Sequence, residues 1–282
     1  MTTIPGGLVD AHAHLTVDFG AGGGIAGSRA AARAAGVLAC RDAGSRCGIA
    51  AEDLDAGREV AAGRFLAPAG GHLRHLLDPT PPEALLEEVA AQVERGVPWI
   101  KVMADFPGPD RNWFATVVNY DVSLVADVVA LAHAGGARVM AHVSGPVVGD
   151  LVTAGVDSIE HGPMADEAVV EAMAARGTIW VPTVGTIERH TGPLEAWRRT
   201  LPLAVALGVP VLVGSDELGP DGVAREAAAL VRLGGLSAAD VLHAATEAAR
   251  SALRLPVQDG DAVTVDGDPR EDVTSLGRLV SR

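Results

Sequence analysis

The chain has 282 residues, of which 48% are hydrophobic and 21% charged, as is ordinary for a packed globular domain. Its net charge of −14 argues against binding nucleic acid, which needs clustered Lys and Arg. Two cysteines are too few for a disulfide framework or a Cys-rich zinc site, and the sequence has neither a signal-peptide pattern at its start nor an apolar run of membrane-spanning length. We therefore expect a cytoplasmic protein without a nucleic-acid or membrane partner.

Short β-rich runs alternate along the chain with Ala- and Leu-rich stretches, which predicts parallel strands joined by crossover helices. Eight strands are expected, at residues 8–14, 37–41, 64–68, 99–104, 138–143, 157–161, 179–183 and 209–214. Between them, stretches such as 82–94 and 123–133 carry apolar residues every three or four positions, as on a buried helix face. Eight such units predict a (β/α)8 TIM barrel over residues 1–255.

An open doubly wound sheet is the alternative fold. The stretch "FGAGGG" at residues 19–24 is rich in glycine but lacks the G-x-G-x-x-G spacing of a dinucleotide-binding turn. After Leu255 the sequence becomes polar and loses its helical spacing, so residues 256–282 are expected to form a C-terminal appendage.

Polar residues fall where the expected strands end, which is the edge of a TIM barrel that carries its active site. His12 and His14 end the first strand, two residues apart and expected to point the same way. A single histidine is most often structural. Here four histidines share this edge with one lysine and one aspartate, which indicates a metal centre. The other members are Lys101, His142, His161 and Asp216.

Lys101 is the only lysine in the chain, and it lies in the apolar run "VPWIKVM". Lysine is almost never fully buried without a partner, so a chemical reason is expected. A desolvated lysine loses its proton readily, and the neutral amine can attack CO2. The carboxylated lysine that results carries a short carboxylate able to reach two cations. Arginine cannot react in this way, because its guanidinium stays protonated.

Several stretches resemble, in order and spacing, the metal-dependent amidohydrolase superfamily, in particular its imidazolonepropionase-like and Xaa-Pro dipeptidase-like branch. They are "LVDAHAH", "WIKVMAD", "VMAHVSG", "VDSIEHG", "VPTV" and "VGSDE". The flanking stretches "GVLACRDAGS" and "LSAADVLHAATEAARSAL" are similar too. The resemblance runs from residue 6 to about residue 275.

The resemblance implies a hydrolase that cleaves a C–N bond in an amide, a peptide-like or a cyclic amide small-molecule substrate, with a hydroxide bridging two divalent metal ions. The implied ligands are His12, His14 and Asp216 for one ion, His142 and His161 for the second, and a carboxylated Lys101 shared by both. Imidazole and carboxylate ligands suit Zn²⁺, although cobalt, nickel or manganese would also fit. Asp216 would take the hydroxide's proton and pass it to the leaving group.

Asp10 and Glu160 neighbour these ligands in the sequence. Their side chains are expected to point away from the barrel interior. There they would either support the ligands or pair with residues of the outer helices.

Aromatic residues gather in the loop after the fourth strand, at Phe106, Trp113, Phe114 and Tyr120. Such clusters usually serve packing. Following a catalytic strand, they could instead wall a pocket for an apolar group, with Arg111 available for a substrate carboxylate.

His72 and His190 lie in loops after the third and seventh strands, where they could reach a substrate or simply be exposed. The other histidines lie in helical or linker stretches and are expected to be structural: His75, His133 and His243.

Family members usually carry several dozen residues before the first motif, and these pair with the C-terminal tail in a small β-sandwich. This chain begins almost at the motif. The resemblance therefore implies a sandwich reduced to a vestige around 262–265, or a tail that packs by another route, such as a homo-oligomer contact. The loop after the eighth strand also lacks a histidine expected ahead of the helix that carries Glu226, so substrate handling can differ from the family's.

Two other functions stay open at this point. Lys101 could form a Schiff base in an aldolase-type lyase barrel, although this leaves the histidines unexplained. Alternatively, the chain could be a metal-binding homologue without turnover. The sequence does not select among dipeptides, N-acyl amino acids, cyclic amides, lactones and phosphotriesters.

Overall fold

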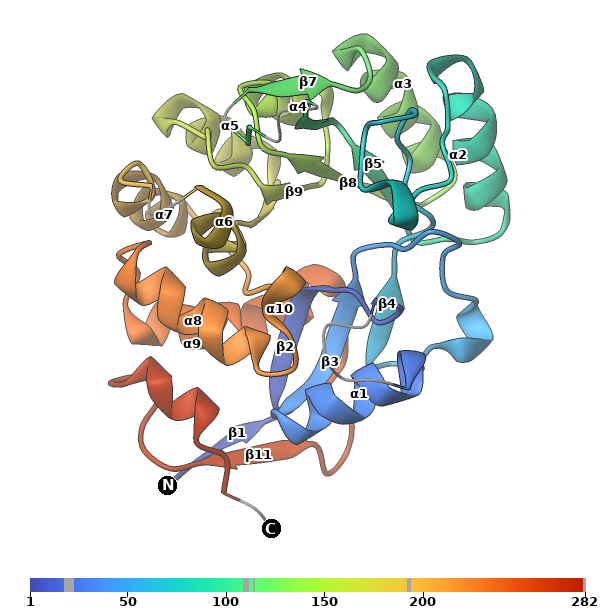
Figure 1. Cartoon of the computed structure of the whole chain (residues 1–282). Coiled ribbons are helices and arrows are strands. Elements are labelled where there is room, and N and C mark those ends of the chain that lie inside the picture. Colours follow the sequence, from blue (N-terminus) through green and yellow to red (C-terminus); the bar gives the residue numbers. More distant parts are fainter. Residues whose placement is uncertain (18–22, 109–111, 114, 192–193, 281–282) are drawn as a thin grey trace.

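The computed structural model describes residues 1–17, 23–108, 112–113, 115–191 and 194–280. Two parallel sheets form its centre (Figure 1). The first has the order β2 (Leu8–Ala13), β3 (Val37–Asp42), β4 (Glu59–Ala61). The second has the order β10 (Ile179–Val181), β9 (Ser158–His161), β8 (Arg138–Val143), β5 (Trp99–Met103).

Isolated backbone contacts link the two sheets on both sides. The links are the bridges Ala62–Trp99 and Leu66–Val102 on one side, and the bridge Trp180–Val211 with the Ala11 N–H to Val213 carbonyl hydrogen bond of 2.8 Å on the other. The parallel segments therefore follow one another around a ring, while regular strand pairing is interrupted at two places. This is a mixed α/β fold.

Two of the expected strands differ from those observed. The third begins earlier, at Glu59, and beyond Gly63 it pairs only through the isolated bridges of Arg64 and Leu66. Gly63 weakens the strand because glycine has no side chain to pack. The eighth pairs only at Val211, and the preceding Pro210 has no N–H to donate to a ladder.

Helices connect the strands and cover the outside of the sheets (Figure 1). They are α1 (Gly24–Ala34), α2 (Leu85–Glu94), α3 (Val122–Ala134), α4 (Val148–Ala154), α5 (Glu167–Arg176), α6 (Val184–Thr191), α7 (Trp197–Ala206), α8 (Gly222–Arg232), α9 (Ala238–Ala244) and α10 (Glu247–Leu253). The helices expected at 82–94 and 123–133 are confirmed as α2, preceded by the 3-10 turn Pro82–Ala84, and as α3. The residues α3 buries recur at helical spacing: Val125, Val128, Val129 and Ala132.

Side chains from both sheets pack together beneath the strand ends. Buried members of this cluster include Val9, Ala39, Trp99, Met140 and Val181. This packing holds the strands in fixed relative positions, and so fixes the residues at their ends.

Two short antiparallel pairs complete the fold. β6 (Asp105–Pro107) and β7 (Thr116–Val118) form a hairpin after β5. β1 (Thr2–Pro5) pairs with β11 (Ala262–Val265), within the tail, and Val265 also bridges to Leu279. The described residues show only this strand group at the termini, and not the two packed sheets of a sandwich.

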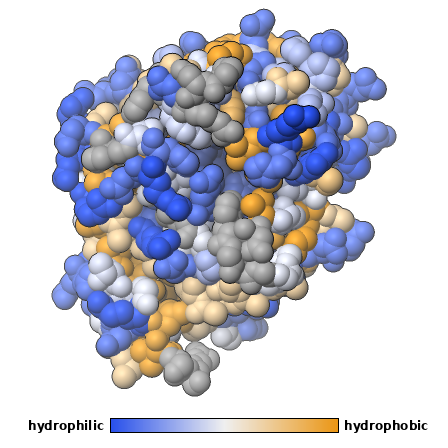
Figure 2. All heavy atoms as spheres, viewed as in Figure 1, coloured by the Kyte–Doolittle hydropathy of each residue, from blue (hydrophilic) through white to orange (hydrophobic). Residues whose placement is uncertain are grey.

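Figure 2 shows hydrophilic side chains spread over the face seen in Figure 1, with smaller hydrophobic groups between them. This is the pattern expected where helices bury one face and expose the other. Among the described residues, no helix combines the length and apolar character needed to cross a bilayer.

Candidate metal centre and adjoining cavity

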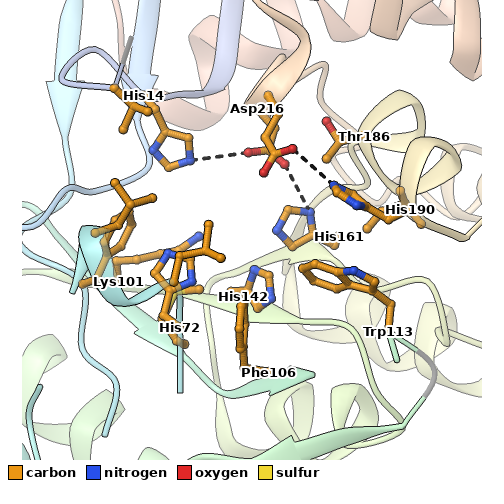
Figure 3. A pocket seen from close by; sticks show the side chains of 17 residues that line it. His14, His72, Lys101, Phe106, Trp113, His142, His161, Thr186, His190 and Asp216 are labelled. Atoms are coloured by element: carbon orange, nitrogen blue, oxygen red, sulfur yellow. Dashed lines mark hydrogen bonds and ion pairs between the residues drawn. The ribbon is translucent and has the colours of Figure 1, made fainter. Parts of the chain in front are cut away.

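A cavity of about 380 Å³ lies at the C-terminal ends of the strands, and Figure 3 shows the side chains that line it. It brings together five of the six residues proposed as ligands: His14, Lys101, His142, His161 and Asp216. The sixth, His12, lies directly beneath, with its ring 5.2 Å from those of His14 and His161. Residues far apart in the sequence thus meet at one edge of the sheets.

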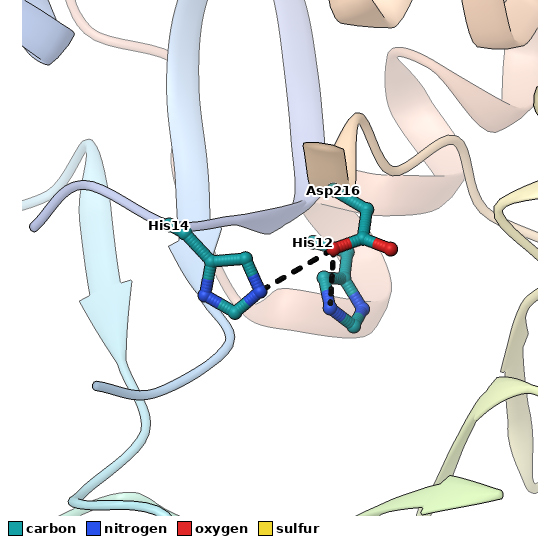
Figure 4. A group of neighbouring side chains, drawn as sticks. All are labelled: His12, His14 and Asp216. Atoms are coloured by element: carbon teal, nitrogen blue, oxygen red, sulfur yellow. Dashed lines mark ion pairs between the residues drawn. The ribbon is translucent and has the colours of Figure 1, made fainter. Parts of the chain in front are cut away.

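Asp216 lies among three of the histidines. Its Oδ1 is 3.5 Å from His14 Nε2 and 3.8 Å from His12 Nε2, while its Oδ2 is 4.0 Å from His161 Nδ1. Figure 4 shows the first two of these contacts. One ligand atom from each of His12, His14 and Asp216 lies within 4.8 Å of the others, so this group could hold a metal ion.

Hydrogen bonds orient the imidazole rings of His12 and His14. His12 Nδ1 lies 2.6 Å from Glu160 Oε2, and His14 Nδ1 lies 3.1 Å from the Gly44 carbonyl oxygen. In His12, the Glu160 acceptor draws the ring proton to Nδ1 and leaves the Nε2 lone pair available to a cation. His14 donates through Nε2 to Asp216, and a cation bound there would replace that proton.

His142 and His161 form a second pair, with ring centroids 4.5 Å apart. His161 Nδ1 lies 2.5 Å from Thr183 Oγ1. The Nε2 of His142 is buried and has no hydrogen-bond partner among the described residues. This atom is therefore free to meet a cation.

Left-handed backbone conformations concentrate at this edge. His161, Thr183 and Asp216 have φ values of 71°, 46° and 47°, and among the described residues only one other non-glycine, Arg254, has a positive φ. Such conformations are costly for residues with a Cβ, and they persist where the surrounding structure holds them. At His161, which ends β9, this conformation re-aims a side chain that would otherwise follow the alternation of the strand.

The expected direction of Glu160 is wrong. Its side chain points into the interior, where Oε1 accepts hydrogen bonds from Arg41 Nη2 at 2.8 Å and from Ser158 Oγ at 2.5 Å, and Oε2 meets His12. Ser158 and Glu160 follow the two-residue alternation of a strand. His161 departs from it through its positive φ, so adjacent residues both face inward.

Asp10 supports the proposed ligands from outside the cavity. Its Oδ1 accepts the backbone N–H groups of His12, at 3.0 Å, and of Ser215, at 2.9 Å. The Ser215 hydroxyl donates to Oδ2 at 2.5 Å. Asp10 therefore ties the end of β2 to the residue before Asp216.

Lys101 is 2% exposed, and its Nζ has no hydrogen-bond partner among the described residues. Burial lowers the pKa of Lys101 to about 8, against the opposing effect of Glu160. A pKa near 8 leaves roughly a tenth of the amine neutral at pH 7, far more than for an exposed lysine.

Burial also lowers the pKa of His12, His142 and His161 well below the ordinary value, so these imidazoles are neutral, as metal ligation requires. Burial alone would raise the pKa of Asp216. The hydrogen bond from His14 and the charge of neighbouring groups outweigh burial and lower it, so Asp216 is a carboxylate.

Four of the residues proposed to contact substrate line the cavity: His72, Phe106, Trp113 and His190. Tyr120 does not, because it is buried in the core and its hydroxyl donates to the Thr80 carbonyl at 2.7 Å. Arg111 and Phe114 lie outside the described residues. The ring centroids of Trp113 and His190 are 5.0 Å apart, and His190 Nε2 lies 3.2 Å from Glu217 Oε2.

Sequence reasoning missed other lining residues: Val17, Phe65, Leu73, Leu76, Met103, Thr186, Ile187 and Glu217. Glu217 could have been found because it follows Asp216, and Thr183 because it belongs to the "VPTV" stretch. The apolar residues carry no signal that separates a cavity wall from a core. His133 and His243 lie elsewhere, beside Asp157 and Glu247.

No protein-family model matches the chain. An uncharacterized protein of Mycobacterium tuberculosis (strain ATCC 25618 / H37Rv) is 33% identical over 298 residues, which cover 94% of this chain and 79% of that protein. Ochratoxinase of Aspergillus niger is 26% identical over 217 residues, which cover 68% of this chain and 45% of that enzyme.

Solved structures are similar over nearly the whole chain. A Xaa-Pro dipeptidase with methionine bound in its active site has a TM-score of 0.76 and 23% identity, and the match covers 98% of this chain and 84% of that one. An amidohydrolase has a TM-score of 0.74 and 23% identity, with 99% and 86% covered. Aspergillus niger ochratoxinase has a TM-score of 0.72 and 23% identity, with 98% and 80% covered.

Proposed function

We propose that this chain is a hydrolase of the amidohydrolase superfamily that acts on C–N bonds, and that it works with two divalent metal ions that would share a carboxylated Lys101. Its similarity to an amidohydrolase, a Xaa-Pro dipeptidase and ochratoxinase supports this proposal. His12, His14 and Asp216 would hold one ion, and His142 and His161 the other. Zn²⁺ suits this ligand set.

The residues present fit such a group. Lys101 Nζ and His142 Nε2 are buried without hydrogen-bond partners among the described residues, although an unpaired buried polar atom costs about 1–3 kcal/mol. Partners from outside the chain would remove that cost. When bound, divalent ions supply Lewis acidity, which polarises a scissile carbonyl and lowers the pKa of the attacking water.

The chain's own residues supply the proton transfer and the surroundings. Asp216, a carboxylate at the centre of the cluster, would take the proton from the attacking water at a carboxylate oxygen and deliver it to the leaving nitrogen. Phe65, Phe106 and Trp113 line the cavity and favour a substrate with an apolar or aromatic group. His72 and His190 lie within reach of such a group.

Lys101 carries the proposal, and it also permits an unusually clean test. As the chain's only lysine, it should give a single side-chain carbamate resonance when the metal-loaded protein is equilibrated with 13C-bicarbonate. Lys101→Arg is the matched control, because it keeps the positive charge and cannot be carboxylated. A carbamate signal of equal intensity in both proteins would exclude Lys101 as its source.

Metal content is the second measurement. We expect two ions per wild-type chain and at most one in Lys101→Arg, with hydrolysis of a panel of Xaa-Pro dipeptides and N-acyl amino acids lowered at least about 100-fold, since two-metal activation is lost. A short carboxylate with bicarbonate should partly restore Lys101→Ala. An unchanged metal stoichiometry in Lys101→Arg would refute the bridging role.

The low pKa of Lys101 also suits a Schiff base, the alternative that its chemistry favours. Borohydride would then trap a carbonyl substrate on the wild-type protein and not on Lys101→Arg. Metal binding without hydrolysis across the panel would instead indicate a homologue that has lost turnover.

We also propose that the ring of parallel segments is a closed (β/α)8 barrel, formed by residues 1–255, and that residues 256–282 with β1 are the remnant of a β-sandwich. The links between the two sheets on both sides support the barrel. The β1–β11 pair supports the remnant.

A further inference from the structure

Asp105 is a buried carboxylate with no part in the proposed chemistry. It is fully buried at the start of β6, four residues after Lys101. Its Oδ1 accepts the Ser144 N–H at 2.8 Å, and its Oδ2 accepts the Gly145 N–H at 2.7 Å and the Thr116 hydroxyl at 3.0 Å. All of its acceptor oxygens are therefore used within the chain.

Two of these contacts fix the turn that follows His142. Ser144 and Gly145 come directly after β8, whose last two residues are His142 and Val143. Hydrogen bonds from backbone N–H groups to a carboxylate are charge-assisted, and they are stronger than hydrogen bonds between two neutral groups. Asp105 on β6 thus fixes the backbone just after His142, a proposed metal ligand.

The contact is also closely packed. A Cβ on Gly145 would lie 2.1 Å from Thr116 Oγ1 and 2.7 Å from Asp105 Oδ2. Only glycine lets the turn approach both groups this closely. A larger residue at position 145 would therefore push the turn away from Asp105 and break the hydrogen bonds.

The remaining contact reaches the wall of the cavity. Asp105 and Thr116 belong to the two strands of the β6–β7 hairpin. On β6, Phe106 packs against Trp113, with ring centroids 5.7 Å apart, and lies 6.2 Å from the ring of His142. Asp105 therefore contacts both the hairpin that carries an aromatic wall and the turn that follows His142.

We propose that Asp105 is a positioning residue that couples the aromatic wall, Phe106 and Trp113, to His142. Its carboxylate joins the hairpin and the turn after β8 into one unit, so that the wall cannot shift without moving the imidazole of His142. The metal-dependent part of this proposal rests on the function proposed above.

Asp105→Asn tests the coupling, because it keeps the side-chain shape and replaces one acceptor oxygen by an N–H donor that faces donors already present. In metal-stripped protein, amide hydrogen exchange should become about tenfold faster over residues 142–147 and over the hairpin. In metal titrations, the ion proposed at His142 and His161 should bind about 10–100-fold more weakly, as is typical when support for a ligand is lost.

Asp157→Asn is the matched control. Asp157 accepts the Val139 N–H at 2.7 Å at the other end of β8, so its loss perturbs the same strand away from the cavity. We expect exchange over residues 142–147 and metal affinity to stay at wild-type values. Gly145→Ala disturbs the Asp105 contact from the other side and should reproduce the effect if Asp105→Asn folds poorly.

The outcomes separate the two proposals. Wild-type exchange at residues 142–147 together with wild-type metal affinity in both Asp105→Asn and Gly145→Ala would overturn the role of Asp105. Faster exchange in these variants, in a protein whose wild type binds no metal, would uphold the coupling and reject the proposed function instead.

Discussion

Arg41 and Glu160 form an ion pair in the interior between the two sheets, 2.8 Å apart, and neither side chain is exposed. The Arg41 guanidinium also donates to the Ala11 carbonyl and lies over the ring of Trp99, 4.6 Å from its centroid. Glu160 in turn meets His12. A buried charge is tolerated only when it is paired, so removing either partner would leave the other charge buried and uncompensated. The same pair holds the carboxylate that orients His12.

Glu160→Gln should therefore lower both stability and metal affinity. Leaving Arg41 buried without its counter-charge is expected to reduce the free energy of unfolding by about 3–5 kcal/mol. Losing the carboxylate that orients His12 should lower the affinity for the ion proposed at His12 and His14 by about 10–100-fold. Chemical denaturation and metal titration measure the two effects.

Glu188→Gln is the control for Glu160→Gln, because Glu188 pairs with Arg232 at 2.7 Å on the surface. An exposed pair contributes about 0–1 kcal/mol. Equal destabilisation by the two substitutions would mean that the buried Arg41–Glu160 pair contributes no more to the free energy of unfolding than an exposed pair does.

Residue types at strand ends suffice to predict which residues gather at the cavity, because the strands of parallel sheets end at a common edge. Side-chain direction is harder to predict. The direction of Glu160 depends on the positive φ of the next residue, His161, and no feature of "IEHG" requires it. Tyr120 looks like a wall residue in the sequence, yet its hydroxyl finds a partner in the core.

The start of α6 depends on a carboxyl group from another helix. Glu226, buried on α8, accepts the N–H groups of Val184 at 2.6 Å and of Gly185 at 2.7 Å. These are among the N–H groups that a helix cannot satisfy itself. Because α6 carries Thr186 and His190 to the cavity, Glu226 sets the position of one wall.

The burial of Glu226 should make stability depend on pH. Burial raises the pKa of Glu226 to about 8, more than the two N–H donors lower it. A carboxyl whose pKa is raised in the folded state binds more protons there than in the unfolded state. Its contribution to stability is therefore complete below about pH 4.5 and is lost as the pH rises through about 8.

Glu226→Gln should remove this part of the pH dependence. Unfolding free energies measured between pH 6 and pH 9 should fall less steeply with rising pH for the variant than for the wild type. Parallel curves for the two proteins would show that Glu226 does not titrate in this range.

Elements with a long periodic pattern are the ones that the sequence predicts well. The expected strand 138–143 coincides with β8, and 123–133 with α3 to within one residue at each end. The sequence does not predict the hairpin β6–β7, because its three-residue strands are too short to show alternation. The eighth strand is weak for a local reason, Pro210, and its place in the ring depends on contacts with β2 and β10 that are distant in sequence.

At the scale of the whole molecule, alternating strand and helix patterns predict an α/β fold, since each helix must cover a strand. They do not predict how completely the sheets join, which depends on single backbone contacts such as Ala11 with Val213. The terminal strand group likewise follows from pairing across about 260 residues of chain, which no local pattern encodes.

Removing metal should destabilise the entire fold, because ions bound to the folded state alone favour that state by mass action. An ion present at 100 times its dissociation constant contributes about 2.7 kcal/mol, or roughly 5–10 °C in the melting temperature of a chain of this size. We expect a chelator to lower the wild-type melting temperature by this amount and that of Lys101→Arg by less. Identical shifts in both proteins would contradict a lysine-bridged ion.

The β1–β11 pair leaves both ends of the described chain beside Val265, with Thr2 paired on one edge and Leu279 on the other. Two strand spacings, roughly 10 Å, separate those edges, a gap that a linker of about four residues could span. The ends also lie at the opposite extremity of β2 from His12 (Figure 1). The ends of the described chain are therefore suited to circular permutation, and a solid support attached at either of them would leave the cavity facing the solution.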